Sequence, residues 1–497
     1  MTLAVFRADA SPVIGGGHVM RCLALADRLR REGWGTAFAC SPETPQTLPF
    51  LASSGHPVVE ADDGAEGLAR CWPGGTHWLV VDNYRLDAAF EARCRPWAKR
   101  ILVIDDLADR RHDCDILLDP NLVRTVSDYR QLTPVACRVV VGPAYAPLRP
   151  QFAQWRERRL MQAKEPDKRI LVSMGLSDSA AAVRRVLEGI EAAGIDALVA
   201  LVAGAGDVET VRVNAAESRL DVAVHAGVDD MASLMAAHDL AVGAAGVSAW
   251  ERCVLGLPTL IVVTAENQRA VARALTDAGA AMALGDAESI TAANVGKALT
   301  ETITRPERLL EMSRRAMAVC DGLGAGRVAM EMAPEPARDG SDVRLRPASE
   351  ADSEMIFEWQ SDPFTRRYFN TPEAPSRAEH MRWMATTVTD PTHCLNVILH
   401  GNTPVGVLRL DLKAGNGKAA GETRKSGSHY DVSILVARRY TGVGIGTAAL
   451  KAARRLIPWA DFVADVHEGN ATSHALFRAA GYRSEGGRYV CQPEAGR

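Results

Sequence analysis

Aromatic residues make up only 5% of this 497-residue sequence, and no two of its ten cysteines form a C-x-x-C pair. Single, scattered cysteines disfavour a disulfide framework or a zinc site and favour reduced thiols in the cytoplasm. No apolar run approaches the ~18 residues that a membrane-spanning helix requires, and no charged leader precedes the first apolar segment. We therefore expect a cytoplasmic protein without a membrane partner.

A strong excess of charge of either sign is also absent. The net charge of −4 and the pI near 6.3 provide no broadly basic surface, so we expect no nucleic-acid partner. Hydrophobic residues make up 47% of the chain and charged residues 24%, as in globular proteins. The chain is too long for one core, and its length suggests about three units of roughly 100 to 200 residues. The sequence leaves the oligomeric state open.

Short apolar segments alternate with helical patterns through the first 330 residues. This alternation predicts an α/β fold class with two Rossmann-like domains, residues 1–150 and 151–331, connected around the charged segment 149–167. The predicted strands are residues 3–6, 79–81, 101–104, 116–118, 139–141, 169–175, 198–202, 222–224, 240–242 and 259–263. Ligands of such folds bind at the carboxyl ends of the strands.

A hydrophilic segment at residues 332–342 predicts a linker to a third domain, residues 343–497. Within this domain, residues 411–428 are rich in Gly, Lys and Ser and lie between two apolar runs. They predict a long hairpin loop.

The most informative motif follows the first predicted strand. Gly15, Gly16 and Gly17 precede His18 and a helical pattern that extends to residue 31. Glycines permit positive φ and close approach of a ligand, and a helix N-terminus favours an anion. His18 beside that anion suits a base that takes a proton from water. A helix-capping histidine is one alternative, and a dinucleotide fingerprint is disfavoured because Met20 stands where its third glycine would be.

A second glycine turn follows the predicted strand at 240–242. We expect a diphosphate to bind the helix N-terminal amides of Gly246, Val247 and Ser248. Glu251, one turn later, could accept hydrogen bonds from ribose hydroxyls. An ordinary turn with Ser248 as its N-cap is the alternative. The polar residues Glu266, Asn267 and Gln268 follow the next strand, where such clusters usually serve a ligand.

Together, these motifs resemble the UDP-sugar hydrolases of pseudaminic acid biosynthesis over residues 1–330. The resemblance is carried by Arg7, Asp9, Ser11, Gly15, Gly17, His18, Arg21, Asp82, Tyr84, Asp105, Asp106, the segment 114–118, Gly142, Tyr145, Leu148, Arg149, Gly246, Ser248, Glu251, Glu266, Asn267 and Gln268. It implies a GT-B fold, related to the MurG type of glycosyltransferase, and hydrolysis of UDP-2,4-diacetamido-2,4,6-trideoxy-β-L-altropyranose. Water attacks the anomeric carbon with inversion, and UDP leaves.

The resemblance also implies roles for individual residues. His18 is the base or the group that positions water. The implied substrate-binding residues are Arg7, Asp9, Gly17, Arg21, Asp82, Tyr84, Gly246, Val247, Ser248, Glu251, Asn267 and Gln268. Because UDP is already a good leaving group, no second carboxylic acid of the glycosidase kind is needed. Asp105 and Asp106 are adjacent on a strand end and point apart, so we expect no metal. The family often has glycine in place of Leu176, whose side chain could narrow the phosphate side of the site.

The third domain has its own glycine loop. An apolar run at 430–436 precedes this loop and a helix at 448–457, and a further strand is predicted at 463–466. This strand, loop and helix would wrap a pyrophosphate. Residues 343–497 resemble the GNAT N-acetyltransferases, which have an α+β fold and bind acetyl-CoA. The implied acetyl-CoA site consists of Leu435, Val436, Arg439, Gly442, Val443, Gly444, Gly446, Thr447 and Asn470.

In that fold, a bulged strand near Ile434 and Val436 polarises the thioester, and Asn470 holds the pantetheine arm. Phe477 occupies the position of a tyrosine that protonates the leaving thiolate, and it cannot donate a proton. Water or another group, with Tyr482 as a candidate, would have to replace it. Glu379, His380, Trp383, Gly406 and Arg409 add resemblance to the branch that acts on amino sugar nucleotides.

We therefore expect a bifunctional enzyme whose partners are a UDP-sugar and acetyl-CoA. The third domain would acetylate a UDP-4-amino sugar, and the first two would then hydrolyse the product, since the implied pathway has these steps in succession. One alternative is a GT-B glycosyltransferase that passes the sugar to an acceptor. Another is a hydrolase whose GNAT domain only binds acetyl-CoA or docks a partner.

Overall fold

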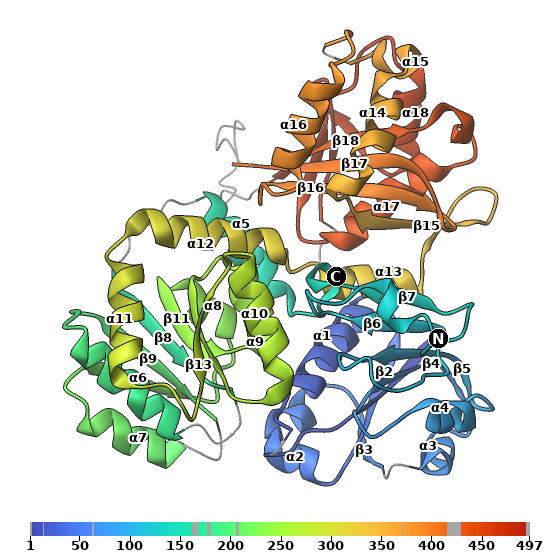
Figure 1. Ribbon diagram of the computed structural model, residues 1–497. Helices are drawn as coiled ribbons and strands as arrows, with labels where there is room; N and C mark the ends of the chain where they lie inside the picture. Colours follow the sequence, from blue (N-terminus) through green and yellow to red (C-terminus); the bar gives the residue numbers. More distant parts are fainter. Residues whose placement is uncertain are drawn as a thin grey trace. The chain divides into compact units, whose positions relative to one another are not determined.

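The computed structural model describes residues 2–12, 14–61, 64–161, 167–175, 180–204, 208–369, 371–414 and 429–493. The chain divides into two compact units, residues 1–156 with 164–325 (unit 1) and residues 157–163 with 326–497 (unit 2). Unit 1 holds two parallel sheets and unit 2 holds one mixed sheet (Figure 1). This architecture is a GT-B pair of Rossmann-like domains followed by a GNAT-like domain, as the sequence predicts.

The first sheet of unit 1 has the strand order β3-β2-β1-β4-β5-β6-β7, and all its pairs are parallel. Its elements are β1 (Leu3–Ala8), α1 (Gly17–Arg31), β2 (Gly35–Cys40), α2 (Glu43–Thr47), β3 (Val58–Glu60), α3 (Ala65–Cys71), β4 (Thr76–Asp82), α4 (Ala88–Cys94), β5 (Ala98–Ile104), β6 (Ile116–Asp119) and β7 (Arg138–Val141). Leu68 and Phe90 of α3 and α4 pack on one face of the sheet. Helix α1 contacts β1, β2 and β4. From β1 the chain first adds strands toward one edge of the sheet and then, from β4 on, toward the other edge. We call the place between β1 and β4 the reversal point, and Rossmann-like sheets bind ligands there.

The second sheet of unit 1 repeats this order as β10-β9-β8-β11-β12-β13. Its elements are β8 (Arg169–Ser173), α6 (Ala180–Ala192), β9 (Leu198–Ala203), α7 (Val208–Glu217), β10 (Asp221–Ala226), α8 (Met231–Ala236), β11 (Leu240–Ala244), α9 (Val247–Val254), β12 (Thr259–Val263), α10 (Arg269–Asp277), β13 (Met282–Asp286), α11 (Ala292–Ile303) and α12 (Pro306–Val319). Alternate strand residues face opposite ways, so Val172 packs with α6 and α11 while Leu171 packs with α8, α9 and α10. The reversal point lies between β8 and β11.

Unit 2 is built on the sheet β14-β15-β16-β17-β18-β19-β21-β20. Its elements are β14 (Glu335–Pro336), β15 (Asp342–Pro347), α14 (Ser353–Ser361), α15 (Pro363–Arg366), α16 (Arg377–Thr387), β16 (His393–His400), β17 (Thr403–Lys413), β18 (His429–Val436), α17 (Ile445–Leu456), β19 (Asp461–Ala464), α18 (Ala471–Ala479), β20 (Arg483–Glu485) and β21 (Arg488–Cys491). Ile356 of α14 and Met384 of α16 pack with Leu395, Val407 and Leu435 on one face of the sheet.

All ten predicted strands of the first 330 residues lie within strands of the structure, apart from the end of 169–175, since β8 ends at Ser173. The prediction missed three further strands, β2, β3 and β13, because their sequences lack a strong apolar run. Segment 149–167 is not simply a loop, because it contains helix α5 (Pro150–Met161), whose first residue is a proline that suits a helix start. Helix α13 (Gly324–Met332) leads to β14, so Glu335 and Pro336 of the predicted linker pair with β15.

Two predictions for the third domain need correction. The strand predicted at 463–466 is β19 (Asp461–Ala464), because pairing with β18 and β21 buries Phe462 and Ala464. The hairpin loop predicted at 411–428 is strand β17 as far as Lys413, and residues 415–428 lie outside the described residues. The remaining domain limits stay predictions. Among the helices of the described residues, none is long and apolar enough to cross a membrane.

Asp119, at the end of β6, makes the stability of unit 1 sensitive to pH. Burial raises its pKa to about 7, although hydrogen bonds from Asn121 and Tyr129 oppose the shift. Between the unfolded value of about 3.9 and 7, the folded protein therefore holds a proton that the unfolded chain has lost, and the free energy of unfolding falls as pH rises. Asp119→Asn should remove this dependence, which amounts to at most about 4 kcal/mol.

Calorimetric unfolding at pH 4.5 and pH 8 would measure the effect. The wild-type protein should lose stability between the two pH values more steeply than Asp119→Asn does. The matched control is Asp109→Asn, because the Asp109 side chain is 59% exposed. If Asp119→Asn and Asp109→Asn show the same pH dependence, the assignment to Asp119 is wrong.

Candidate functional site

Four predicted residues lie together at the reversal point of the first sheet, where β1 and β4 end. They are His18, Arg21, Asp82 and Tyr84. His18 is the second residue of α1, and Gly15 with φ of +72° turns the chain into this helix. Gly16 is the N-cap and provides no side chain, so no side chain bonds the first amides of α1. Arg21 lies one turn after His18, and Asp82 ends β4. This geometry follows from the strand–glycine–helix pattern that the sequence predicts.

Arg21 links the ends of two strands. Its Nε and Nη2 donate to the two carboxylate oxygens of Asp82 at 2.6 and 2.7 Å, and its Nη1 donates to Asp106 at 2.9 Å. Arg21 and Asp82 are buried, and removing one partner of such a pair typically costs about 3–5 kcal/mol. Burial raises the pKa of Asp106, but the charges of Arg21 and His18 and hydrogen bonds from Arg21 and Tyr84 outweigh it and lower that pKa.

His18 lies between Asp82 and Tyr84. The distance from its Nδ1 to Asp82 Oδ1 is 3.7 Å, and its ring meets the Tyr84 ring edge-on with centroids 4.5 Å apart. Because Nδ1 faces a carboxylate, a proton on Nδ1 leaves Nε2 as the acceptor. Burial raises the pKa of Tyr84, so its hydroxyl stays protonated. The arrangement can therefore orient the imidazole as a base.

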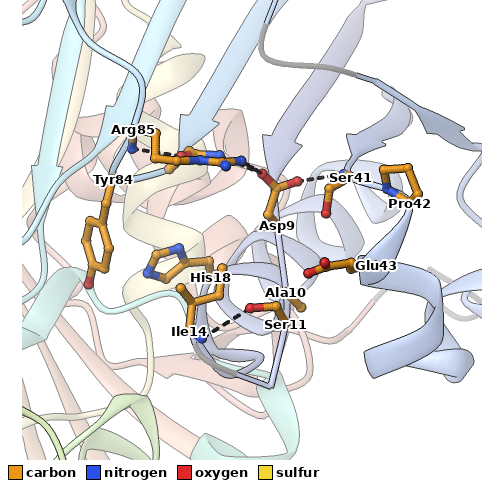
Figure 2. A pocket seen from close by; sticks show the side chains of 11 residues that line it. Asp9, Ala10, Ser11, Ile14, His18, Ser41, Pro42, Glu43, Tyr84 and Arg85 are labelled. Atoms are coloured by element: carbon orange, nitrogen blue, oxygen red, sulfur yellow. Dashed lines mark hydrogen bonds and ion pairs between the residues drawn. The ribbon is translucent and has the colours of Figure 1, made fainter.

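A cavity of about 420 Å³ opens beside His18 (Figure 2). Its lining consists of Asp9, Ala10, Ser11, Ile14, His18, Ser41, Pro42, Glu43, Asn83, Tyr84 and Arg85. The volume is that of a typical small-molecule site. Sequence reasoning missed Ser41 and Glu43 because they follow β2, which carried no strand signal. Asn83 could have been predicted from the sequence, because it is a polar residue directly after a predicted strand, between Asp82 and Tyr84.

The carboxylate of Asp9 already accepts several hydrogen bonds. Arg7 Nη1 and the Ser41 amide donate to Oδ1 at 2.5 and 2.7 Å, and Asn83 Nδ2 donates to Oδ2 at 2.7 Å. Burial raises the pKa of Asp9, but Arg7 and the other donors lower it overall. Arg7 is fully buried and lies outside the lining, so its contact is with Asp9. Arg7 therefore supports Asp9, and Asp9 lines the cavity.

The second predicted cluster lies at the reversal point of the second sheet. Helix α9 begins at Val247 with Gly246 as its N-cap, and no side chain caps it. Ser248 is therefore not the N-cap, and its hydroxyl instead accepts a hydrogen bond from Arg252 at 3.2 Å. Arg252 also donates to the carbonyl of Ala244. A Cβ on Gly243 would lie 2.5 Å from the Ser173 carbonyl oxygen, so only glycine fits there.

Three other predicted ligand contacts are engaged within the protein. Burial raises the pKa of Glu251, although Arg149, 4.0 Å away, and Arg252 oppose this. Gln268 Oε1 accepts from the amides of Ala245 and Thr264 at 3.3 and 3.2 Å, so it braces the turn. Asn267 Nδ2 donates to the Tyr84 hydroxyl at 3.3 Å. Leu176 and its neighbours at 176–179 lie outside the described residues.

Unit 1 brings the two clusters into contact. A Cβ on Gly17 would lie 3.2 Å from Val247 Cγ2, so the start of α1 closely approaches the start of α9. Asp105 bonds Arg110 and Tyr129, whereas Asp106 bonds Arg21, so the two carboxylates do point apart. Within the described residues, no group of three His, Cys, Asp or Glu side chains is arranged to hold a metal ion.

In unit 2, the glycine loop turns from β18 into α17. Gly442 and Gly444 have φ of +90° and +93°, and Gly444 is the N-cap of α17 without a side-chain cap. A Cβ on Gly444 would lie 2.8 Å from the Arg338 amide nitrogen, and this amide donates to the Val443 carbonyl at 2.9 Å. The loop is thus held in a shape that exposes helix N-terminal amides.

Among the described residues, one edge of strand β18 lacks a strand partner beside this loop. It pairs with β19 only over residues 429–431, and the edge from Val432 to Val436, which includes Leu435, lacks that partner. The bulge expected near Ile434 and Val436 is wrong, because the β17–β18 register is continuous. The register shift lies between Ile398 and Leu399, in the pairing of β16 with β17. The open edge exposes the backbone groups that a bulge was expected to present.

The remaining predicted residues of unit 2 have structural contacts. Asn470 is the N-cap of α18, and its side chain accepts from the Ser473 amide at 3.1 Å. Phe477 is buried and stacks on Tyr489 with centroids 5.5 Å apart. Tyr482 meets Phe477 edge-on, and its buried hydroxyl has no hydrogen-bond partner among the described residues. Arg439 and Thr447 flank the loop, and a Cβ on Gly446 would lie 3.0 Å from Leu476 Cδ1.

Comparison with known families matches the second half of unit 1 and most of unit 2. Residues 342–483 match the family described as acetyltransferase (GNAT) domain. Residues 169–323 match the family described as glycosyltransferase family 28 C-terminal domain. The chain therefore combines a GNAT-type domain with a glycosyltransferase-28-type domain, which are two enzyme-type domains.

Similar proteins cover different parts of the chain. An uncharacterized protein of Methanocaldococcus jannaschii is 21% identical over 77% of this chain and 78% of its own length. The UDP-2,4-diacetamido-2,4,6-trideoxy-β-L-altropyranose hydrolase of Campylobacter jejuni is 31% identical over 30% of this chain, which is about half (53%) of that protein. The UDP-N-acetylglucosamine–N-acetylmuramyl-(pentapeptide) pyrophosphoryl-undecaprenol N-acetylglucosamine transferase of Aeromonas hydrophila is 27% identical over 64% of this chain and 93% of its own length.

Gly444→Ala should weaken acetyl-CoA binding. An alanine at φ of +93° is strained by about 1–3 kcal/mol, and its Cβ would collide with the Arg338 backbone. We expect the Kd for acetyl-CoA, measured by titration calorimetry, to rise at least about 10-fold, as a change of about 1.4 kcal/mol implies. The control is Gly401→Ala, which has φ of +58° and nothing within 4 Å of the added Cβ. Unchanged affinity in Gly444→Ala would rule out this loop as the acetyl-CoA site.

Proposed function

We propose that unit 1 hydrolyses a UDP-sugar, with UDP-2,4-diacetamido-2,4,6-trideoxy-β-L-altropyranose as the substrate, and that unit 2 acetylates the 4-amino precursor of that sugar. The observation that carries the hydrolase proposal is the placement of His18. It lines a sugar-sized cavity, faces the buried carboxylate of Asp82 and lies at the start of an uncapped helix. The partial similarity to the hydrolase of Campylobacter jejuni supports the choice of substrate.

In this proposal, His18 Nε2 accepts a proton from water while the water oxygen attacks the anomeric carbon. Asp82 orients the imidazole and stabilises its positive charge, as a carboxylate does in other histidine-based sites. Arg21 holds Asp82 in place, and Tyr84 limits the tilt of the ring. The bond between the anomeric carbon and the phosphate oxygen breaks, and the configuration inverts because water attacks from the face opposite UDP.

The charge that develops on UDP needs stabilisation on the other side of the sugar. The uncapped amides of Gly246, Val247 and Ser248 at the start of α9 suit the diphosphate, and Glu251 suits the ribose hydroxyls. Gly17 and Val247 approach each other closely, so a sugar beside His18 would have its diphosphate near α9. Asn267 donates a hydrogen bond to the Tyr84 hydroxyl, and in this proposal both side chains would contact the sugar.

Unit 2 would act before unit 1 on the same molecule. The glycine loop from Gly442 to Gly446, with Arg439 and Thr447, would hold the pyrophosphate of acetyl-CoA, and the open edge at Leu435 and Val436 would pair with its pantetheine arm. The match to the GNAT family supports acetyl-CoA as the co-substrate. Joining the two activities in one chain suits consecutive reactions, provided that the sites can exchange the sugar.

A glycosyltransferase is the second candidate function for unit 1. The match of residues 169–323 to a glycosyltransferase family favours it, as does the similarity to a transferase over 93% of that protein. The same cavity would then hold an acceptor hydroxyl in place of water, and His18 would deprotonate it. The two functions differ in whether UDP release requires an acceptor.

Replacing His18 should separate catalysis from binding. We expect His18→Gln to lower kcat for UDP release about 10²- to 10⁴-fold with little change in KM, because a general base acts mainly in the transition state. The assay incubates the diacetamido UDP-sugar without any acceptor and resolves UDP and free sugar by NMR. His225→Gln is the matched control, since His225 lies on β10, outside the cavity lining.

Three results would distinguish the candidates. Acceptor-free release of sugar that depends on His18 supports the hydrolase. Release only after addition of a sugar or lipid-linked acceptor would establish the transferase instead. Wild-type rates in His18→Gln would contradict the role of His18 in either reaction.

Phe477→Tyr should accelerate acetyl transfer by unit 2. By the resemblance to the GNAT enzymes, Phe477 stands where many members have a proton-donating tyrosine, so a hydroxyl there would protonate the thiolate of CoA as it leaves. We expect kcat to rise by up to about 10²-fold with acetyl-CoA affinity unchanged. The measurement follows CoA release by chromatography with the UDP-4-amino sugar as acceptor. Tyr489→Phe is the companion variant, because it keeps the stacked ring and adds no donor, removing only the hydroxyl that lies 3.1 Å from His474 Nδ1. An unchanged kcat in Phe477→Tyr would mean that protonation of the thiolate does not limit turnover.

A further inference from the structure

Arg252 of α9 is among the largest fully buried side chains of the protein. It is 1% exposed, and its neighbours in the sequence, Trp250, Cys253 and Leu255, belong to a hydrophobic core of unit 1. Burying a guanidinium in such surroundings is unfavourable unless a negative charge compensates it. Within the part of the chain that the structure describes, Arg252 forms hydrogen bonds but no ion pair. The fold thus buries a cation without a carboxylate partner.

The acidic residue next to Arg252 does not provide that partner. Adjacent side chains on a helix point in different directions, and the Glu251 carboxylate has its ion-pair contact with Arg149, at 4.0 Å. Burial lowers the pKa of Arg252 to about 10, although the charges of Cys253 and Glu251 oppose the shift. The guanidinium therefore stays charged at neutral pH, and the residues around it compensate this charge only in part.

The guanidinium of Arg252 holds both ends of the turn between β11 and α9. Its Nη1 donates to the Ser248 hydroxyl at 3.2 Å, and its Nη2 donates to the carbonyl of Ala244, the last residue of β11. A Cβ on Gly243 would lie 2.9 Å from Arg252 Nη1, so the guanidinium lies directly against the end of the strand. The positive charge is therefore fixed on the buried side of this turn.

The other side of the turn offers hydrogen-bond donors. Among the described residues, no side chain caps α9, and a Cβ on Gly246 would meet only Gln268 Nε2, at 4.0 Å. The Ser248 hydroxyl accepts from Arg252, so its own proton is available for donation. A hydrogen bond received from a cation strengthens the one that the hydroxyl donates. The turn thus combines helix amides and a polarised hydroxyl with a cation behind them.

We propose that Arg252 supplies the positive charge of the diphosphate site at the start of α9, and that it acts through the Ser248 hydroxyl and the turn without touching the nucleotide. This inference rests on the proposed function of unit 1 as an enzyme that uses a UDP-sugar. Arg252 is a positioning residue in this scheme. The bound diphosphate supplies the negative charge that the buried guanidinium lacks within the protein.

The same charge would assist the departure of UDP. When the bond between the sugar and the phosphate breaks, the terminal phosphate gains about one negative charge, because it is no longer esterified. A fixed cation stabilises this added charge without reorganisation. Arg252 should therefore matter more for UDP than for a neutral ligand that shares only the nucleoside.

The test measures binding of UDP to the full chain by titration calorimetry and binding of uridine by ligand-observed NMR. Arg252→Gln keeps a hydrogen-bond donor and removes the charge. A unit charge about 8 Å from a phosphate, at an effective dielectric constant of about 20, changes affinity about 30-fold. We expect the Kd for UDP to rise about 10- to 30-fold and the Kd for uridine to change little. Arg252→Lys should recover most of the UDP affinity.

Two further measurements separate this role from a structural one. The melting temperature of nucleotide-free Arg252→Gln should be at least that of the wild type, because a buried charge without a carboxylate partner is removed. In a double-mutant cycle with Ser248→Ala, the combined loss of UDP affinity should be smaller than the product of the two single losses, because the charge acts through this hydroxyl. The control is Arg273→Gln on α10, whose side chain is 86% exposed, and it should leave both affinities unchanged.

Wild-type UDP affinity in Arg252→Gln would overturn the proposal. Equal losses for UDP and uridine, a lower melting temperature or failure of Arg252→Gln to fold would also overturn it, since Arg252 would then be structural. Independent losses in the double-mutant cycle would contradict the route through Ser248. If the wild-type chain binds no UDP, the proposed function of unit 1 fails and this inference fails with it, whereas UDP binding that Arg252→Gln retains overturns this inference alone.

Discussion

The ion pairs of the buried Arg21 guanidinium are the interactions on which the site around His18 depends. The guanidinium joins helix α1 to the ends of β4 and β5 through Asp82 and Asp106, and each of these charges requires its partner because it is buried. His18 lies three residues before Arg21 on the same helix, so its ring is carried against Asp82. The ion pair between Arg21 and Asp82, which stabilises the fold, thereby also sets the orientation of the His18 imidazole.

Glycine turns at sheet edges provide the other shared constraint. In unit 1, the six strands of the second sheet follow the same order as the first six strands of the first sheet, and a glycine-rich turn leads into a helix at each reversal point. In unit 2, Gly444 performs the same task after β18. All three helices begin without a side-chain cap, so their first amides remain available to an anion. In the proposed functions, the same feature, an uncapped helix N-terminus after a glycine turn, would bind a nucleotide diphosphate in unit 1 and a coenzyme pyrophosphate in unit 2.

The two units differ in the groups that they offer to their proposed ligands. In the proposed reaction of unit 1, the imidazole of His18 backed by the Asp82 carboxylate suits deprotonation of a neutral nucleophile, and the uncapped amides of α9 suit an anionic leaving group. In unit 2, the open edge of β18 offers backbone groups that suit the neutral pantetheine arm of the proposed co-substrate.

Local pattern determined much of this protein. Apolar runs predicted ten strands of unit 1, and glycines located the turns before α1, α9 and α17, because apolar runs and glycines are visible in the local sequence. Tertiary structure alone decided that Arg7 supports Asp9 and that Gln268 braces a turn. It also decided that β18 parts from β19 where a bulge was expected. These features depend on strand register and on buried polar groups finding partners distant in the chain, and neither leaves a periodic signal in the sequence.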